Sequence, residues 1–261
     1  MADKARNHLL PMERLEYIRA AVEKEGAVRV ADLSRRLGVS EATVRHDLAQ
    51  LERMGVVRRT YGGATLRRGT LFERSFREQE AQYREEKARI AEEAVKLVRP
   101  GQMLLLDVGT TTTAIARRLP DLEGLVVCTS GLNIAVELER CRNVTVIVTG
   151  GTVRYKQHSL VNPFGTLLIS KINADLLFLG CNGISAEYGV TNSNLPEAEI
   201  KQAMVRAAKE VVVVADSSKV GNVAAAHIAP LSAVDMLITD SGADPEELER
   251  IRKSGVKVVV V

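Results

Sequence analysis

The feature that most constrains the fold of this sequence is a pair of short helical patterns joined at a glycine. Residues 31–37 (ADLSRRL) predict a short helix, and Gly38 can take the left-handed conformation that ends a helix and turns the chain. Ser40 is a favourable N-cap for a second helix beginning at Glu41, because apolar residues then recur at helical spacing. This order of elements predicts a helix-turn-helix motif, whose second helix enters the major groove of DNA.

Two short extended segments follow the second helix. Residues 56–61 and 64–67 surround a pair of glycines, as in a β-hairpin turn. Residues 27–30 supply a third short β segment, and apolar positions between residues 15 and 22 mark a first helix. Together these patterns predict a winged helix of three helices over residues 1–68.

The charge distribution favours DNA as the partner of this domain. Residues 1–68 carry 14 Lys and Arg against 9 Asp and Glu, whereas residues 69–261 carry 22 against 24. A basic head is typical of a module that binds phosphates, although similar short helical patterns also occur in domains that do not bind DNA. The residues expected to contact double-stranded operator DNA are Ser40, Thr43, Arg45, His46, Gln50, Arg58, Arg59 and Tyr61.

From residue 102 onward, short apolar runs alternate with helical patterns. The expected strands are residues 103–106, 125–128, 144–148, 176–179, 211–215, 236–239 and 257–261, and the expected helices are residues 112–119, 132–139, 164–172, 196–208 and 245–254. This alternation predicts an α/β domain over residues 99–261, with a mostly parallel sheet covered on both faces. Between the two domains we expect a hinge at residues 68–70 and, over residues 69–98, a linker and a charged docking helix with Lys87 on its polar side.

Small and hydroxylated residues follow several of these strands. The loop from Asp107 to Thr113 (DVGTTTT) is the longest, and shorter loops of this kind cover residues 129–131, 149–151 and 216–219. Because ligands of parallel sheets bind beyond the carboxyl ends of the strands, we expect these loops to converge on one crevice. The first loop opens a helix, whose free amides stabilise an anion such as phosphate. The alternative is that its threonines only cap the helix.

Segments along almost the entire chain resemble the DeoR family of bacterial transcriptional regulators. They include LGVSEATVRHDLAQLERMG, RRTYGGAT, EEKARIAEEA, LLLDVGTTTTAIA, LLFLGCNGI, YGVT, ADSSKVG and LITD. The resemblance implies a fold similar to ribose-5-phosphate isomerase and coenzyme A transferases, and a phosphorylated sugar or related metabolite as effector. His46 stands where the family commonly has a second Arg, and a neutral imidazole cannot make the bidentate guanine contact of an Arg.

The resemblance and the strand-end loops together indicate the effector-binding residues. Carried over by motif, Gly109, Thr110, Thr111 and Thr112 are expected to hold phosphate, followed by Lys219, with Asp107, Ser130 and Asp175 as candidates for the sugar and Lys201 as a further possibility. The sequence lacks the Walker P-loop and the complete G-x-G-x-x-G motif, which disfavours nucleotide binding. We expect no catalytic residue, metal ion or cofactor.

These observations predict a repressor of carbohydrate-metabolism genes whose operator binding responds to a phosphorylated sugar. The alternatives are an isomerase-like enzyme with an accessory DNA-binding head, using Asp107, Asp175, Asp216 or Lys219 for proton transfer, and an architectural DNA-binding protein without a ligand. Repeated half-sites would call for a homodimer or homotetramer.

The lengths of the apolar runs and the cysteine content indicate the expected location of the protein and the state of its thiols. The sequence contains no run of the roughly 20 apolar residues that span a bilayer, so we expect a cytoplasmic protein without a membrane partner. Its three cysteines are odd in number and lack metal-ligand spacing, so we expect buried thiols in place of disulfides or a zinc site.

Overall fold

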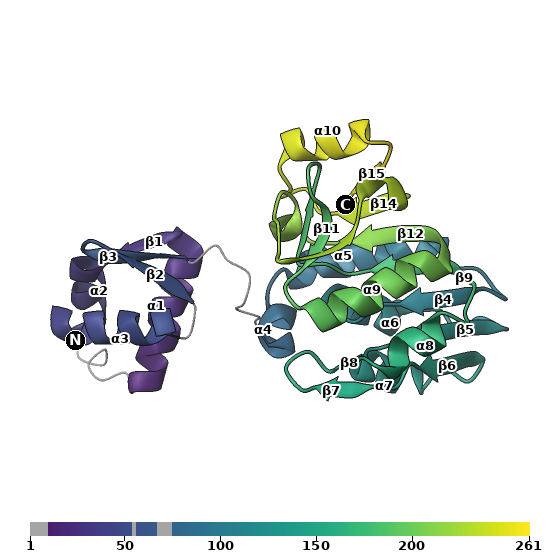
Figure 1. Ribbon diagram of the computed structural model, residues 1–261, viewed down its shortest axis with the longest axis horizontal. Coiled ribbons are helices and arrows are strands. Elements are labelled where there is room, and N and C mark those ends of the chain that lie inside the picture. The colour runs from purple at the N-terminus through teal and green to yellow at the C-terminus, as the bar shows by residue number, and fades with distance from the viewer. Residues whose placement is uncertain (1–9, 54–55, 67–74) are drawn as a thin grey trace, which may run out of the picture. The chain divides into compact units, whose positions relative to one another are not determined.

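The structure is a computed structural model that describes residues 10–53, 56–66 and 75–261. The chain divides into two compact units, residues 1–72 and residues 73–261 (Figure 1). The hinge expected at residues 68–70 lies outside the described residues.

The first unit is a winged helix, as predicted. Its elements are α1 (Pro11–Glu25), β1 (Ala27–Arg29), α2 (Val30–Leu37), α3 (Glu41–Arg53), β2 (Val57–Thr60) and β3 (Gly63–Leu66). The three strands form an antiparallel sheet in the order β1-β3-β2. Apolar side chains of all three helices meet in its core, among them Ile18, Leu33 and Leu48.

The turn between α2 and α3 has the geometry expected from its sequence. Gly38 is left-handed (φ 66°, ψ 26°), and the Thr43 amide donates to the Ser40 hydroxyl at 3.1 Å. A second contact fixes α3 against α1, because Arg14 donates to both carboxylate oxygens of the buried Asp47, at 2.5 and 3.1 Å. This hydrogen-bonded pair also raises the pKa of Arg14. The orientation of α3 therefore depends on a bidentate ion pair as well as on the apolar core.

The second unit contains a seven-stranded parallel sheet in the order β15-β14-β12-β9-β4-β5-β6. Its strands are β4 (Met103–Leu106), β5 (Leu125–Thr129), β6 (Val144–Val148), β9 (Ala174–Leu179), β12 (Ala208–Val214), β14 (Met236–Thr239) and β15 (Lys257–Val260). All seven lie where the apolar runs predict them, which confirms the predicted fold class. The sequence did not predict the hairpin of β7 (Thr152–Arg154) and β8 (Ser159–Val161), or the small antiparallel sheet of β10 (Gly183–Ser185), β11 (Gly189–Asn192) and β13 (Ala226–Ala229).

Helices cover both faces of the large sheet. On one face lie α5 (Arg84–Ala94), α6 (Thr110–Arg118) and α7 (Leu132–Leu138), and on the other lie α8 (Phe164–Ile169), α9 (Leu195–Ala207) and α10 (Pro245–Lys253). Figure 1 shows α8 and α9 in front of the sheet and α5 and α6 behind it. Alternate side chains of a strand enter opposite layers: Leu104 and Leu106 pack with α5 and α6, and Leu105 packs in the other core. Thus α5 is part of the core of this unit.

Short helices complete the unit. They are α4 (Phe76–Ala81) and the 3-10 turns η1 (Val95–Leu97), η2 (Ser217–Lys219) and η3 (Leu231–Ala233). Helix α4 begins with a capping box, in which Ser75 and Glu78 satisfy each other's amides. Within the described parts of the chain, no helix is long and apolar enough to cross a membrane.

The strand order determines where a ligand can enter. From β4 the chain adds β5 and β6 on one side, and later β9, β12, β14 and β15 on the other. The loops after β4 and β9 therefore leave the sheet in different directions, which opens a crevice at their carboxyl ends.

Candidate functional site: a DNA-binding face and an effector pocket

Helix α3 presents a polar face opposite its buried stripe. Val44 and Leu48 are buried on the inner side, whereas Arg45 and His46 are exposed. The Arg45 guanidinium lies 2.5 Å from Glu41, one turn earlier on the same face, and remains largely exposed. Of the other expected DNA contacts on this helix, Thr43 and Gln50 are half-buried. This face offers hydrogen-bond donors at the spacing of one helical turn, as a recognition helix requires.

The wing carries the other residues expected at DNA. Tyr61 is fully exposed in the turn between β2 and β3. Arg59 is held by Glu52 of α3, whose carboxylate accepts from the Arg59 amide at 3.0 Å and lies 3.5 Å from its guanidinium. The side chain of Arg58 lies outside the described residues. Ser40 is already engaged as the N-cap of α3, so its hydroxyl serves the helix.

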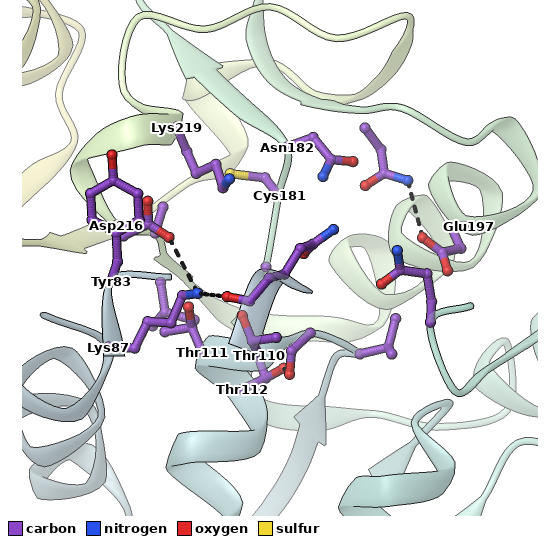
Figure 2. A pocket seen from close by; sticks show the side chains of 18 of the residues that line it. Tyr83, Lys87, Thr110, Thr111, Thr112, Cys181, Asn182, Glu197, Asp216 and Lys219 are labelled. Carbon is purple, nitrogen blue, oxygen red and sulfur yellow. Dashed lines mark hydrogen bonds and ion pairs between the residues drawn. The ribbon is translucent and has the colours of Figure 1, made fainter. Parts of the chain in front are cut away.

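A pocket lies at the carboxyl ends of β4, β9 and β12, at the point where the strand order reverses (Figure 2). The first turn of α6 and the loops of residues 180–182 and 214–219 form three of its walls. The fourth comes from α4 and α5, through Gln79, Gln82, Tyr83 and Lys87. Its free volume is about 60 Å³, which is room for roughly four water molecules.

The first turn of α6 has no capping side chain. Gly109 precedes it with φ 154° and ψ 169°, a conformation open almost only to glycine. The hydroxyls of Thr112 and Thr113 donate to the Gly109 carbonyl, at 3.0 and 2.6 Å, and no described side chain accepts from the amides of this first turn. The interpretation of these threonines as simple caps is therefore wrong. Thr110, Thr111 and Thr112 line the pocket with the positive end of the α6 dipole.

Two of the three lysines that line the pocket have partners. Lys201, on α9, is buried and donates to the Asp107 carboxylate and, at 3.0 Å, to the Gly180 carbonyl. Lys87, on α5, donates to the Gln79 and Gln82 carbonyls at 2.6 and 2.7 Å. Burial lowers the pKa of Lys87 to about 8, although Asp216, 3.9 Å away, opposes this shift. Both ammonium groups hold the walls of the pocket together.

The ammonium group of the third lysine, Lys219, has no hydrogen bond or ion pair with any residue that the structure describes. Figure 2 shows its side chain extending along the pocket wall toward Cys181. Burial raises the pKa of the Cys181 thiol to about 12, so this cysteine is a poor nucleophile. The available charge in the pocket therefore resides on Lys219.

Of the residues expected at the effector, the structure brings together Gly109, Thr110, Thr111, Thr112 and Lys219, with Lys201 beside them. Asp107 is fully buried, and its Oδ2 accepts from the Gly180 amide at 2.9 Å while Oδ1 has no hydrogen-bond partner. Burial raises the pKa of Asp107, an effect that Lys201 opposes. Asp107 thus lies behind the pocket wall and orients Lys201.

Besides Asp107, two further expected residues do not line the pocket. Asp175 is the second residue of β9, at the amino end of the sheet, where it accepts from the Met103 amide at 2.9 Å and from Lys209 at 2.8 Å. Ser130 is buried beyond β5, where its carbonyl accepts from the Leu160 amide at 2.8 Å. The pocket walls include neither residue. The placement of Asp175 in the crevice is therefore wrong, because parallel strands put their amino ends on the opposite edge.

Sequence reasoning missed the wall formed by α5. Lys87 was expected on the polar side of this helix, but it is buried together with Ile90, Ala91 and Ala94. These four positions have the spacing i, i+3, i+4 and i+7 of one helical face, so a cation on an apolar stripe was the available signal. Glu197 was also missed as a pocket residue; it is buried and accepts from the Ser159 hydroxyl at 2.6 Å.

The cysteines differ in their environments. All three are free thiols; Cys128 is buried as expected, whereas Cys141 and Cys181 are partly exposed. The expectation of three buried thiols is therefore correct only for Cys128.

These two units define a class of protein: a helix-turn-helix DNA-binding domain joined to a separate ligand-sensing domain. The family of DeoR-like helix-turn-helix domains matches residues 14–69, and the family described as the DeoR C-terminal sensor domain matches residues 82–241. The chain therefore belongs to the DeoR family and is a DNA-binding transcriptional regulator.

Full-length relatives agree with this assignment. The HTH-type transcriptional regulator GlpR of Haloferax volcanii is 38% identical over 96% of this chain and 98% of its own. A putative aga operon transcriptional repressor of Escherichia coli O157:H7 is 36% identical over 95% of this chain and 93% of its own. Among solved structures, ribose 5-phosphate isomerase A of Methanocaldococcus jannaschii is 17% identical with a TM-score of 0.40, over 53% of this chain and 55% of its own.

Proposed function

We propose that this regulator represses carbohydrate-metabolism genes, and that a phosphorylated sugar in the pocket controls its binding to operator DNA. The observation that carries the proposal is the meeting of two unused positive groups in one pocket. These groups are the uncapped first turn of α6 and the unpartnered ammonium of Lys219. A phosphate placed between them would receive amide hydrogen bonds and a full positive charge.

Each wall of the pocket has a role in this proposal. Thr110 and Thr111 supply backbone amides and hydroxyls to the phosphate oxygens, and Lys219 neutralises their charge. Asn182 and Glu197, on the far side of the pocket, offer a donor and an acceptor for sugar hydroxyls. The free volume of about 60 Å³ is small for a whole sugar phosphate, and we propose that the walls move when the ligand enters.

Such movement is what a regulator requires. A ligand shifts the balance between two arrangements of a protein only if it binds one of them more tightly. We propose that this shift changes how two DNA-binding heads of a homodimer or homotetramer meet repeated half-sites, since one winged helix buries little DNA surface.

Thermal unfolding with a panel of sugars tests the proposal. We expect sugar phosphates, but not the unphosphorylated sugars, to raise the Tm, because a ligand that binds only the folded state stabilises it. Thr111→Glu places a carboxylate against the phosphate and should abolish this shift, whereas Thr145→Glu, at an exposed position of the edge strand β6, should preserve it.

Two further measurements complete the test. Product analysis on the same samples should show no turnover; turnover would favour the isomerase-like enzyme. Sequencing of DNA captured by the protein, with and without the stabilising sugar phosphate, should show operator sites that are lost or gained with the ligand. Capture of the same sites in both conditions would contradict control by that ligand.

A further inference from the structure

A second hollow of about 600 Å³ lies beside the effector pocket. Its floor is one face of α6, where Thr110, Ala114 and Arg117 follow each other at i, i+4 and i+7. Its walls come from α4 and from the start of α5. The small side chain of Ala114 leaves the space that the surrounding longer side chains enclose.

The hollow is strongly basic. Arg77, Arg84, Lys87 and Arg117 line it, against the single carboxylate of Glu80. Arg117 is occupied, since it lies 2.8 Å from Glu80 and 2.8 Å from Glu137. Arg77 and Arg84 are exposed, and their guanidinium groups form no hydrogen bond or ion pair with the residues that the structure describes. Two unoccupied guanidinium groups beside one hollow suit a phosphoryl group, which they bind in bidentate geometry.

The hollow and the effector pocket share two residues, Lys87 and Thr110. Both are buried, so they are accessible to a small ligand but not to the backbone of a DNA duplex. The two hollows therefore meet at Lys87 and Thr110. This contiguity favours one extended ligand over two unrelated sites.

We propose that this basic hollow binds a second phosphoryl group, so that the two compartments together hold a ligand phosphorylated at both ends, such as a sugar bisphosphate. The inference rests on the proposed function, because it extends the same effector site. In it, the α6 first turn and Lys219 hold one phosphate, Arg77 and Arg84 hold the other, and Lys87 lies between them.

Calorimetric titration of three ligands tests the inference: a hexose 6-phosphate, a hexose 1,6-bisphosphate and inorganic phosphate. We expect the bisphosphate to bind the full-length protein about tenfold more tightly than the monophosphate, because both guanidinium groups are exposed and solvent screening reduces the contribution of each. Arg77→Gln combined with Arg84→Gln should remove this difference and leave monophosphate binding unchanged. Arg142→Gln combined with Arg206→Gln makes the same charge change at exposed positions of the second unit and should change neither value.

A single substitution should strengthen the preference for the bisphosphate instead of removing it. Glu80→Gln removes the one carboxylate among the described residues that line the hollow, so bisphosphate affinity should rise severalfold while monophosphate affinity stays constant. If inorganic phosphate binds to the monophosphate complex and loses this binding in the Arg77 and Arg84 variant, the hollow takes a separate phosphate, which also supports a phosphoryl site.

Other outcomes overturn the inference. Equal affinities of wild type for monophosphate and bisphosphate, or a difference that survives the double substitution, would remove the second site and leave the proposed function intact. A double variant that loses operator affinity but keeps its bisphosphate preference would assign the two arginines to DNA. Absence of binding by every phosphorylated sugar would overturn the proposed function and this inference together.

Discussion

The Lys219 ammonium lines the pocket and has no partner among the residues that the structure describes. A side chain in this position contributes little to folding, so its removal should affect the ligand alone. We expect Lys219→Gln to weaken sugar-phosphate binding about tenfold, the effect of losing one charge-assisted hydrogen bond, with an unchanged Tm of the free protein. Calorimetric titration and thermal unfolding measure the two quantities. Lys171→Gln, at an exposed position beyond α8, is the matched control and should leave both unchanged.

Lys87 makes effector binding sensitive to pH. Its pKa is lowered to about 8 because burial disfavours the ammonium; Lys219 adds to this shift, and Asp216, Glu80 and Glu86 oppose it. A phosphate ester is already a dianion at pH 7, so raising the pH from 7 to 9 discharges Lys87 without changing the ligand. We expect affinity to fall about threefold to tenfold over this range, measured by titration at each pH.

A rise in pH affects the stability of the fold in the opposite direction to the affinity for the ligand. The pKa of Lys87 is about 8 in the folded protein and 10.5 for a lysine exposed to water, as in the unfolded chain, so between these values the unfolded chain binds more protons. The contribution of Lys87 to the free energy of unfolding therefore increases as the pH rises through this window.

Lys87→Met should remove the pH dependence of effector binding. A wild-type affinity that stays constant from pH 7 to 9 would show that Lys87 does not face the ligand.

At the scale of elements, the pocket depends on how the chain passes from β4 into α6. Gly109 has a conformation that other residues adopt at a cost of about 1–3 kcal/mol, and an added Cβ would lie 3.3 Å from the Thr112 hydroxyl. We expect Gly109→Ala to lower the free energy of unfolding by this amount and to abolish the effector response, because the first turn of α6 must shift. Chemical denaturation and ligand titration measure these effects.

Gly101→Ala separates backbone strain from loss of the pocket. Gly101 is also left-handed (φ 74°), has open space around its Cβ position and lies before β4, at the opposite edge of the sheet. We expect this variant to be less stable and still to respond to the effector. Loss of the response in both variants would indicate that general destabilisation, and not the α6 turn, is responsible.

Elements of this fold could be predicted to the extent that each carries its own signal. The seven strands of the large sheet are apolar runs bounded by polar loops, and Gly38 and Ser40 are local signals for the turn before α3. Strands β10 (GIS) and β11 (GVTN) are short and contain glycine and polar residues, so neither forms an apolar run, and β11 pairs with β13 across more than thirty residues.

The residues of the site could also be predicted only where a local sequence signal exists. Asp175 precedes its apolar run, so the sequence already placed it at the amino end of a strand, away from the crevice. Lys87 could have been found from its place on an apolar stripe. The pairing of Lys201 with Asp107 joins residues 94 positions apart, and only the tertiary structure reveals it. Local signals thus predicted the α6 turn and Lys219, but not the walls that enclose them.

At the scale of the whole molecule, the question is how the two units influence each other. Arg45 lies on the exposed face of α3, away from the core of its unit. We expect Arg45→Ala to weaken operator binding by about 1–3 kcal/mol and to relax the preference for one base pair, measured by titration of labelled operator variants at fixed salt. Arg142→Ala, in the other unit, should leave operator binding unchanged. Wild-type affinity of Arg45→Ala would move the recognition surface off this face of α3.

Thermodynamic linkage then provides a test of communication between the units. If a sugar phosphate lowers operator affinity by some factor, operator DNA must lower sugar-phosphate affinity by the same factor. We expect this equality in the wild type, measured by titrating each ligand in the presence and absence of the other. In Arg45→Ala the free protein should bind the sugar phosphate as the wild type does, because the substitution lies in the other unit. Unequal factors would mean that the ligand and the DNA act on different assemblies of the protein, and the coupling would then have to be sought in its oligomerisation.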